Sequence, residues 1–205
     1  MNIRMAIVIG GVGPDRFGPA AADWLTCRAG LRKHPPGDQA AAPAVVMGVD
    51  VDVDVDVLDL AEAWLPPVPC ERPSVAPPAV RDLAPWLASA DAFVIVTPEH
   101  NHSFPASLKN AVDWYRDEWR AKPVAFVSYG DDGGGTAAVE QLRPVFAALD
   151  AVTVSGGLAF RHGRPPPVAA AEHLLDRLLW WARALRAARD TLPMNWRYHH
   201  VPRQP

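Results

Sequence analysis

The sequence lacks the cysteine, charge and hydrophobic patterns that mark three large classes of protein. Only two cysteines occur in 205 residues, Cys27 and Cys70, and their separation suits neither a disulfide framework nor a zinc knuckle or redox dithiol. The formal net charge of −3 provides no basic field for nucleic acid. The apolar run that ends at Gly10 is too short to span a membrane, and no signal-peptide cleavage pattern follows it. We therefore expect free thiols in a cytoplasmic protein with neither a nucleic-acid nor a membrane partner.

Apolar runs and helical stripes alternate along the chain. Hydrophobic residues make up 49% of it, enough for one continuous core. Four runs are typical of buried strands: 5–9, 93–97, 124–128 and 151–154. Three helical stripes join Leu108, Val112, Tyr115 and Trp119; Ala138, Leu142, Val145 and Leu149; and Leu174, Leu178, Ala182 and Leu185. The alternation predicts an α/β fold with a parallel sheet over residues 1–190, with 191–205 as a tail or arm.

The segment 49–57 alternates valine and aspartate strictly. As a strand it would place its aspartates on one face and its valines on the other, which favours an edge strand with the carboxylates in water. Calcium binding is the sharper alternative, but a strand spreads its ligands in a line instead of curling them around an ion.

Three loops that follow strands carry the candidate site, because ligands of open α/β sheets bind beyond the carboxyl ends of the strands. The first loop, 10–18, reads GGVGPDRFG and leads into a helix. Glycines let backbone amides approach an anion, the helix start adds partial positive charge, and Arg16 can grip a phosphate. The loop matches neither the Walker nor the GxGxxG pattern, so a plain glycine-rich turn is an equal alternative.

The second loop, 97–105, reads TPEHNHSFP and gathers polar groups and an aromatic ring in one strand-to-helix turn. Such a loop can offer donors and acceptors to the edge of a flat heteroaromatic ligand and an apolar surface to its face. A metal site at His100 and His102 is the alternative, but no third ligand stands at a supporting spacing. The third loop, 128–136, reads SYGDDGGGT, and its glycines would let backbone pass close to a ring. Its alternative is a flexible turn before a helix capped near Thr136.

Together these loops resemble the NADPH-dependent FMN reductase family, which includes quinone and azo-dye reductases of flavodoxin-like fold. The segment 98–114 reads PEHNHSFPASLKNAVDW and is similar to the family signature PEYNxSxPxxLKNxxDW. Further similarity lies in 16–24, at Asp59 and Leu60, and in 128–142. The resemblance implies a three-layer fold with a five-stranded parallel sheet, FMN and NADPH as cofactors, and a homodimer or homotetramer. The helix after the second loop, with Trp114 and Trp119, would then lie near the subunit interface or the site.

By this resemblance the first loop holds the FMN phosphate, the second the pyrimidine side of the ring and the third its other flank. The implied cofactor-binding residues are Gly11, Gly13, Arg16, Phe17, Gly18, Pro98, Glu99, His100, Asn101, His102, Ser103, Ser128, Tyr129, Gly130, Gly133 and Gly134. No side chain is assigned a catalytic role, since the flavin carries the chemistry. No metal is expected.

Two residue differences set the chain apart from the family. Gly11 and Gly13 stand where relatives usually carry a serine and an arginine, and His100 stands where tyrosine is typical. The expected function is electron transfer from NADPH through FMN to a quinone, a nitro or azo compound, or free flavin. The alternatives are a flavodoxin-like binding module with weak or no turnover, and a flavin-independent enzyme that uses His100 or Glu99 for proton transfer.

Overall fold

The computed structural model describes residues 2–28, 53–69, 71 and 73–192. Five strands form a parallel sheet in the order β2-β1-β3-β4-β5. Their bounds are β1 Ile3–Ile9, β2 Val53–Asp59, β3 Ala92–Pro98, β4 Pro123–Gly130 and β5 Val152–Thr153. A short sixth strand, β6 (Leu158–Arg161), pairs with the carboxyl half of β4, beyond the pairing with β5. The predicted parallel α/β sheet is confirmed.

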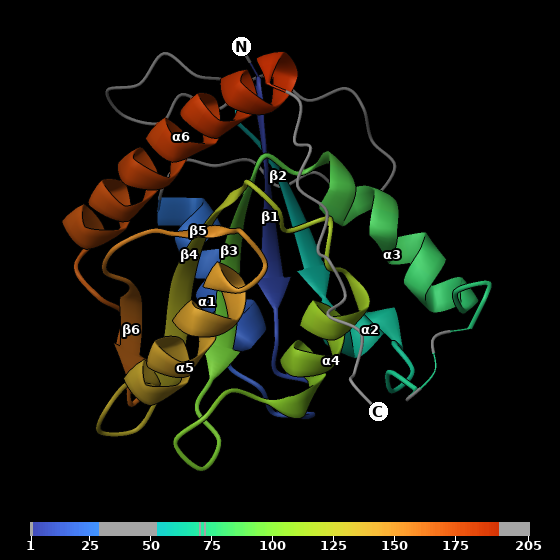
Figure 1. Ribbon diagram of the computed structural model, residues 1–205. Coiled ribbons are helices and arrows are strands. Elements are labelled where there is room, and N and C mark those ends of the chain that lie inside the picture. The colour runs from blue at the N-terminus through green and yellow to red at the C-terminus, as the bar shows by residue number, and fades with distance from the viewer. Residues whose placement is uncertain (1, 29–52, 70, 72, 193–205) are drawn as a thin grey trace.

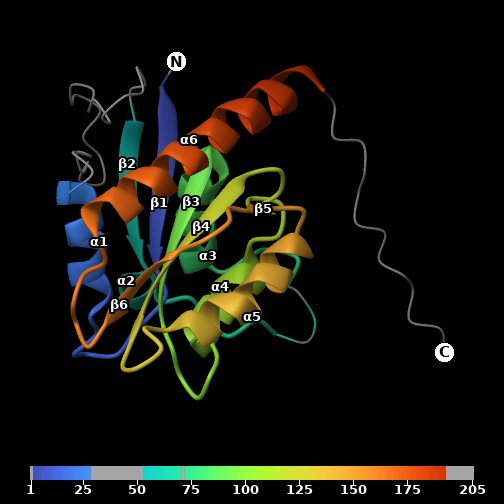
Figure 2. The same ribbon diagram turned by 90° about the vertical axis from the view of Figure 1, so that its left-hand side faces the viewer.

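Helices cover both faces of this sheet (Figures 1 and 2). They are α1 Gly18–Arg28, α2 Leu60–Ala63, α3 Pro78–Ser89, α4 Ala106–Trp114, α5 Thr136–Ala147 and α6 Val168–Thr191. One core cluster joins the sheet to α1 and α6, and the other joins it to α3, α4 and α5. Every residue of β3 is buried, as a central strand covered on both faces requires. None of the described helices is long and apolar enough to cross a bilayer.

The edge position predicted for the Val-Asp segment is confirmed for β2, while 49–52 and Cys70 lie outside the described residues. The expectation that its aspartates lie in water is wrong for Asp56. Asp56 is only 6% exposed, and its carboxylate accepts a hydrogen bond from Arg4 Nε at 2.6 Å. The Arg4 guanidinium also lies 5.3 Å from the centre of the Trp86 ring. The edge carboxylate is therefore neutralised by an arginine of the neighbouring strand.

The helical stripe predicted through Trp119 also needs correction. Helix α4 ends at Trp114, and Tyr115 leaves the helical conformation. Trp119 is nevertheless fully buried, with its ring centre 4.5 Å from that of Phe93 and 5.4 Å from that of Phe146. Trp114 is buried as well and donates from Nε1 to the Pro66 carbonyl at 2.7 Å. Both tryptophans belong to the core.

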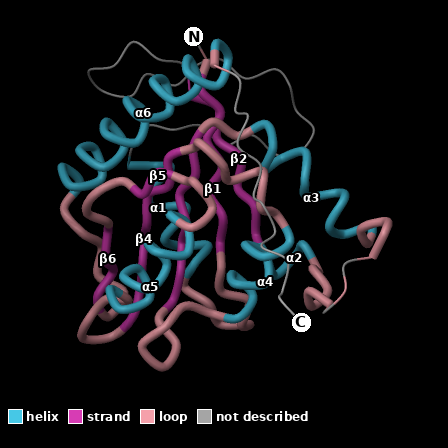
Figure 3. The backbone as a smooth tube through the Cα atoms, in the orientation of Figure 1, coloured by secondary structure: helices cyan, strands magenta, loops and turns pink. Residues whose placement is uncertain are grey.

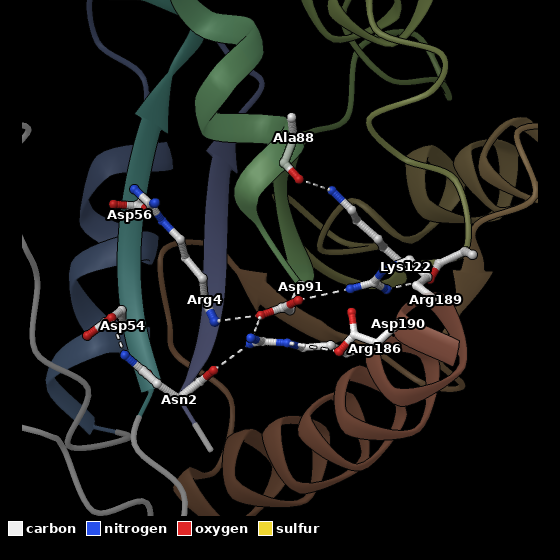
Figure 4. A network of polar contacts seen from close by, with 11 residues as sticks. Asn2, Arg4, Asp54, Asp56, Ala88, Asp91, Lys122, Arg186, Arg189 and Asp190 are labelled. Carbon is white, nitrogen blue, oxygen red and sulfur yellow. Dashed lines mark hydrogen bonds and ion pairs between the residues drawn. The ribbon is translucent and has the colours of Figure 1, made fainter. Parts of the chain in front are cut away.

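A buried carboxylate ties the amino-terminal end of the sheet together (Figure 4). Asp91, just before β3, accepts hydrogen bonds from Arg186 and Arg189 of α6, both at 2.9 Å, and from the Arg4 amide at 3.2 Å. Nearby, Lys122 Nζ donates to the last carbonyls of α3, those of Leu87 and Ala88, at 2.9 and 2.8 Å. These bonds fix α3 and α6 to the sheet at the end opposite the candidate site.

Replacement of Asp91 tests this anchor. Asp91→Ala leaves two arginines without their shared acceptor, so we expect the free energy of unfolding to fall by about 3 kcal/mol. Asp190→Ala is the control. The Asp190 side chain is 66% exposed, and its carboxylate forms a long ion pair with Arg186, at 4.0 Å. The control should cost less than about 0.5 kcal/mol. Equal midpoints for the two variants in urea denaturation would contradict the anchoring role.

Lys122 gives the protein a distinct pH dependence. Burial lowers the pKa of its ammonium group to about 8, whereas the pKa of an unfolded lysine is about 10.4. Between these values the unfolded chain binds more protons, so this group makes stability rise with pH, by roughly 3 kcal/mol over the interval. Lys122→Met should remove that rise, and Lys109→Met, which changes a half-exposed lysine, should retain it. Urea denaturation between pH 7 and pH 10.5 measures the difference; parallel curves for both variants would contradict the assignment.

Candidate functional site

Three loops meet at the carboxyl edge of the sheet, as the strand order predicts (Figure 3). They follow β1, β3 and β4, which are neighbours in the sheet. The Gly10 amide donates to the Val96 carbonyl at 2.8 Å and the Glu99 amide donates to the Tyr129 carbonyl at 3.3 Å, so the first and second loops each start bonded to the next strand. The three segments singled out from the sequence therefore lie side by side at one edge of the sheet.

In the first loop, Arg16 is held by the end of β2. Its Nη2 donates to Asp59 Oδ2 at 2.6 Å and its Nη1 lies 3.4 Å from the Gly13 carbonyl. The hydrogen bond to the Asp59 carboxylate raises the pKa of Arg16. Asp59 also caps α2, because its Oδ1 accepts from the Ala61 amide at 3.0 Å. Arg16 Nε is buried and has no hydrogen-bond partner in the described part of the chain.

Tyr129 forms the floor of the first loop. A Cβ atom on Gly11 would lie 2.6 Å from the Tyr129 hydroxyl oxygen, a distance that only glycine avoids. One on Gly18 would lie 2.6 Å from Ile9 Cγ2, whereas one on Gly13 would meet nothing within 4 Å. Burial raises the pKa of Tyr129 to about 12, and the hydroxyl donates to no acceptor among the described residues. Gly11 is therefore required by the tyrosine beneath it.

Phe17 packs inward. Its ring centre lies 5.6 Å from that of Tyr129 and 5.3 Å from that of Phe160, both edge to face. Of the five first-loop residues predicted to bind the cofactor, Phe17 thus anchors the loop on the core. Gly13 and Arg16 lie nearer the surface.

The second loop is a tight turn. The His100 amide donates to the Ser103 carbonyl at 2.7 Å, and the Ser103 amide returns a bond to His100 at 3.0 Å. Between them Asn101 and His102 both have positive φ, 51° and 59°, as in a two-residue hairpin turn. The His102 side chain is 91% exposed. The turn holds polar side chains outward, where they can meet the edge of a ligand.

Glu99 and Gln141 fix this turn to α5. Glu99 Oε2 accepts from the Ala137 amide at 3.1 Å, in the first turn of α5, and Oε1 lies 3.4 Å from His102 Nδ1. Gln141 Nε2 donates to the His102 carbonyl at 2.6 Å, and its Oε1 accepts from Ser103 Oγ at 2.7 Å. Glu99 stabilises the partial positive charge of the helix start. The structure thus shows it anchoring the loop.

The third loop is closed on itself by Ser128, whose Oγ donates to the Gly134 carbonyl at 2.7 Å. Gly135 has φ of 83°, and a Cβ there would meet Ser128 Cβ and the Tyr129 carbonyl at 2.8 Å. Gly133 is open to solvent, with only the Thr136 hydroxyl 3.5 Å from a Cβ built on it. The glycine run lets the backbone fold tightly against β4. Pro98 is the last residue of β3, and Gly130 is the last residue of β4.

Sequence reasoning missed the residues that hold these loops. Asp59 and Gln141 belong to segments that resemble the family, but neither was predicted to hold a loop, and His162 lies outside those segments. The His162 amide donates to the Gly130 carbonyl at 3.1 Å, and its Nε2 lies 3.3 Å from Asp132 Oδ1. The signal for Asp59 was available, because it ends a strand that neighbours β1. A hollow of about 440 Å³ beside β2 and α3 touches this region at Asp59 and otherwise lies outside the three loops. No group of three potential metal ligands is assembled anywhere in the described ranges.

The sheet order, the helical layers and the loops at one edge define a flavodoxin-like α/β protein. The sequence model of the NADPH-dependent FMN reductase family matches residues 3–164, and the chain belongs to that family. An NAD(P)H-dependent FMN reductase of Schizosaccharomyces pombe is 52% identical over 63 residues, 31% of each chain. One of Saccharomyces cerevisiae is 34% identical over 123 residues, 55% of this chain and 63% of its own length. The chain thus spans less than two thirds of these relatives.

Solved structures agree on the fold. The flavoenzyme NAD(P)H:acceptor oxidoreductase FerB of Paracoccus denitrificans superposes with a TM-score of 0.63 over 90% of this chain and 98% of its own. Its sequence identity is 20%, so the likeness shows the architecture alone.

The residues present fit FMN. The first loop is rich in glycine and precedes α1, so its backbone amides can face a phosphate. The buried Arg16 Nε and the Tyr129 hydroxyl are donors that lack acceptors, and an unsatisfied buried donor costs about 1–3 kcal/mol. A ligand rich in acceptor oxygens would satisfy them.

A glycine pair tests the floor of the loop. Gly11→Ala should destabilise the fold by about 1–3 kcal/mol, since overpacking forces the Tyr129 hydroxyl to move. Gly13→Ala is the matched control and should change the unfolding midpoint little, because the added methyl group meets open space. Removing the hydroxyl in Gly11→Ala/Tyr129→Phe should recover most of the loss. Thermal denaturation measures all three, and an equal loss in both single variants would contradict the contact.

Proposed function

We propose that this protein is an FMN-dependent oxidoreductase that passes two electrons from NAD(P)H to a quinone, a nitro or azo compound, or free flavin. The observation that carries the proposal is the joining of three loops of the family pattern at one sheet edge, each held by hydrogen bonds to its neighbour. FMN, when bound, supplies the hydride chemistry.

Each loop has a distinct part in this proposal. The first loop receives the phosphate on its backbone amides, with Gly13 and Arg16 nearest the surface. The turn at 100–103 presents the Asn101 amide group and main-chain polar groups to the edge of the ring. Gly130 and Gly133 let the backbone of the third loop lie against the ring. Glu99 and Gln141 keep the turn rigid, so little conformational freedom is lost on binding.

The acceptor and the assembly extend the proposal. A broad range of flat acceptors is consistent with a site built mainly from backbone and exposed polar side chains. A homodimer or homotetramer follows from the family pattern, with α4 near the interface. Within α4 the exposed Lys109 and Asp113 pair with each other at 2.6 Å, so they present a neutral surface. Cytoplasmic location belongs to the same proposal.

The direct test is spectroscopic. Purified protein mixed with FMN and freed of unbound ligand should retain a flavin absorption band, and anaerobic addition of NADPH should bleach it. A retained band that NADPH leaves unchanged would indicate a binding module without turnover. Loss of the band on desalting, together with an NADPH oxidation rate that ignores added FMN, would refute the flavin-dependent activity.

Asn101 allows a sharper test of the second loop. Asn101→Gly keeps the left-handed backbone and removes one polar side chain, so the affinity for FMN should fall about fivefold, the effect of one hydrogen bond. Asp150→Gly makes the same backbone change at φ of 58° in a turn distant from the loops. It should leave the affinity unchanged. Equal FMN affinities for both variants in a fluorescence titration would remove Asn101 from the site.

A further inference from the structure

The first loop carries no net positive charge for a phosphate. Within 10–18 the charged residues are Asp15 and Arg16, and the segment contains no serine, threonine or lysine. The structure adds Asp59, whose carboxylate accepts from Arg16 Nη2 at 2.6 Å. Arg16 is therefore paired with Asp59, and the formal charges of Asp15, Arg16 and Asp59 sum to −1.

The Arg16 guanidinium already forms hydrogen bonds within the protein. Nη2 bonds to Asp59 and Nη1 faces the Gly13 carbonyl, so Nε is the nitrogen left without a partner. Only 20% of the Arg16 side chain and 12% of the Asp59 side chain are exposed. An incoming phosphate thus meets one edge of a neutralised ion pair.

Side-chain hydroxyls offer little compensation. A serine at position 11 is excluded, because its Cβ would lie 2.6 Å from the Tyr129 hydroxyl. Ser107 is near the loop, but its hydroxyl donates to the Gly10 carbonyl at 2.5 Å. The remaining donors are the Tyr129 hydroxyl and the backbone amides. These groups are neutral, and no full positive charge adds to their attraction for a phosphate.

From this geometry we infer that the site takes riboflavin nearly as well as FMN, and that Asp59 sets this low discrimination by neutralising Arg16. The inference rests on the proposed flavin-binding function. Asp59 acts through Arg16 and is therefore a positioning residue. The ligand class is flavins with or without the 5′-phosphate, with the ring supplying most of the binding.

Fluorescence titration of the full chain with FMN and with riboflavin tests the inference. The two dissociation constants of the wild type should agree within about tenfold. Asp59→Asn removes the charge and keeps the cap of α2, because asparagine caps as well as aspartate. This variant should bind FMN on the order of tenfold more tightly and riboflavin unchanged, since only FMN carries the phosphate.

Asp56→Asn is the matched control. It makes the same substitution in the same strand, and Asp56 also pairs with an arginine at 2.6 Å, but that arginine is Arg4, not a residue of the first loop. It should leave both dissociation constants unchanged. A second readout is salt: FMN binding should weaken with added NaCl more steeply in Asp59→Asn than in the wild type, because Arg16 is then unneutralised.

The outcomes separate the inference from the function beneath it. If wild-type protein binds FMN more than tenfold more tightly than riboflavin, or if Asp59→Asn fails to tighten FMN, the inference is wrong while the flavin-binding function stands. If neither flavin binds, the proposed function itself fails. A gain of affinity for both flavins in Asp59→Asn would also overturn the inference, because the effect would not depend on the phosphate.

Discussion

Three neighbouring parallel strands, β1, β3 and β4, set the position of everything at the site. Because helices cover both faces of the sheet, these strands are built almost wholly from buried apolar side chains and tolerate little displacement. Parallel direction then forces their three following loops to one edge. Polar residues that are far apart in the sequence are brought together there, and the loops need only short-range bonds to stay in register.

The two ends of the sheet are stabilised differently. At the amino-terminal end, Asp91 is enclosed by arginines of α6, and Lys122 holds the end of α3. At the carboxyl end, Asp59 and Glu99 each cap a helix and at the same time hold a loop residue. The rigid end fixes the sheet. The site end uses exposed turns whose geometry depends on a few caps, which suits a surface that must admit a ligand.

The sequence was sufficient for the sheet, the loops and the family, because apolar runs and the long motif at 98–114 are local patterns. It was insufficient for side-chain partners. Arg16 and Asp59 are 43 residues apart, and no local rule pairs them. Helix α3 was not predicted, because prolines at 77, 78 and 85 obscure the helical spacing of its apolar residues. Proline is nevertheless tolerated in the first turn of a helix. Trp119 matched a helical stripe by spacing, yet it reaches the core from a turn beyond α4.

The contact between Gly11 and Tyr129 also constrains how this protein can change over generations. A side chain at position 11 becomes tolerable only after position 129 has given up its hydroxyl or the ring has shifted. The order of substitution is therefore imposed: a route that begins at Gly11 passes through a destabilised intermediate, whereas one that begins at Tyr129 does not meet this clash. Descendants of this chain should accordingly retain the glycine for as long as they retain the tyrosine.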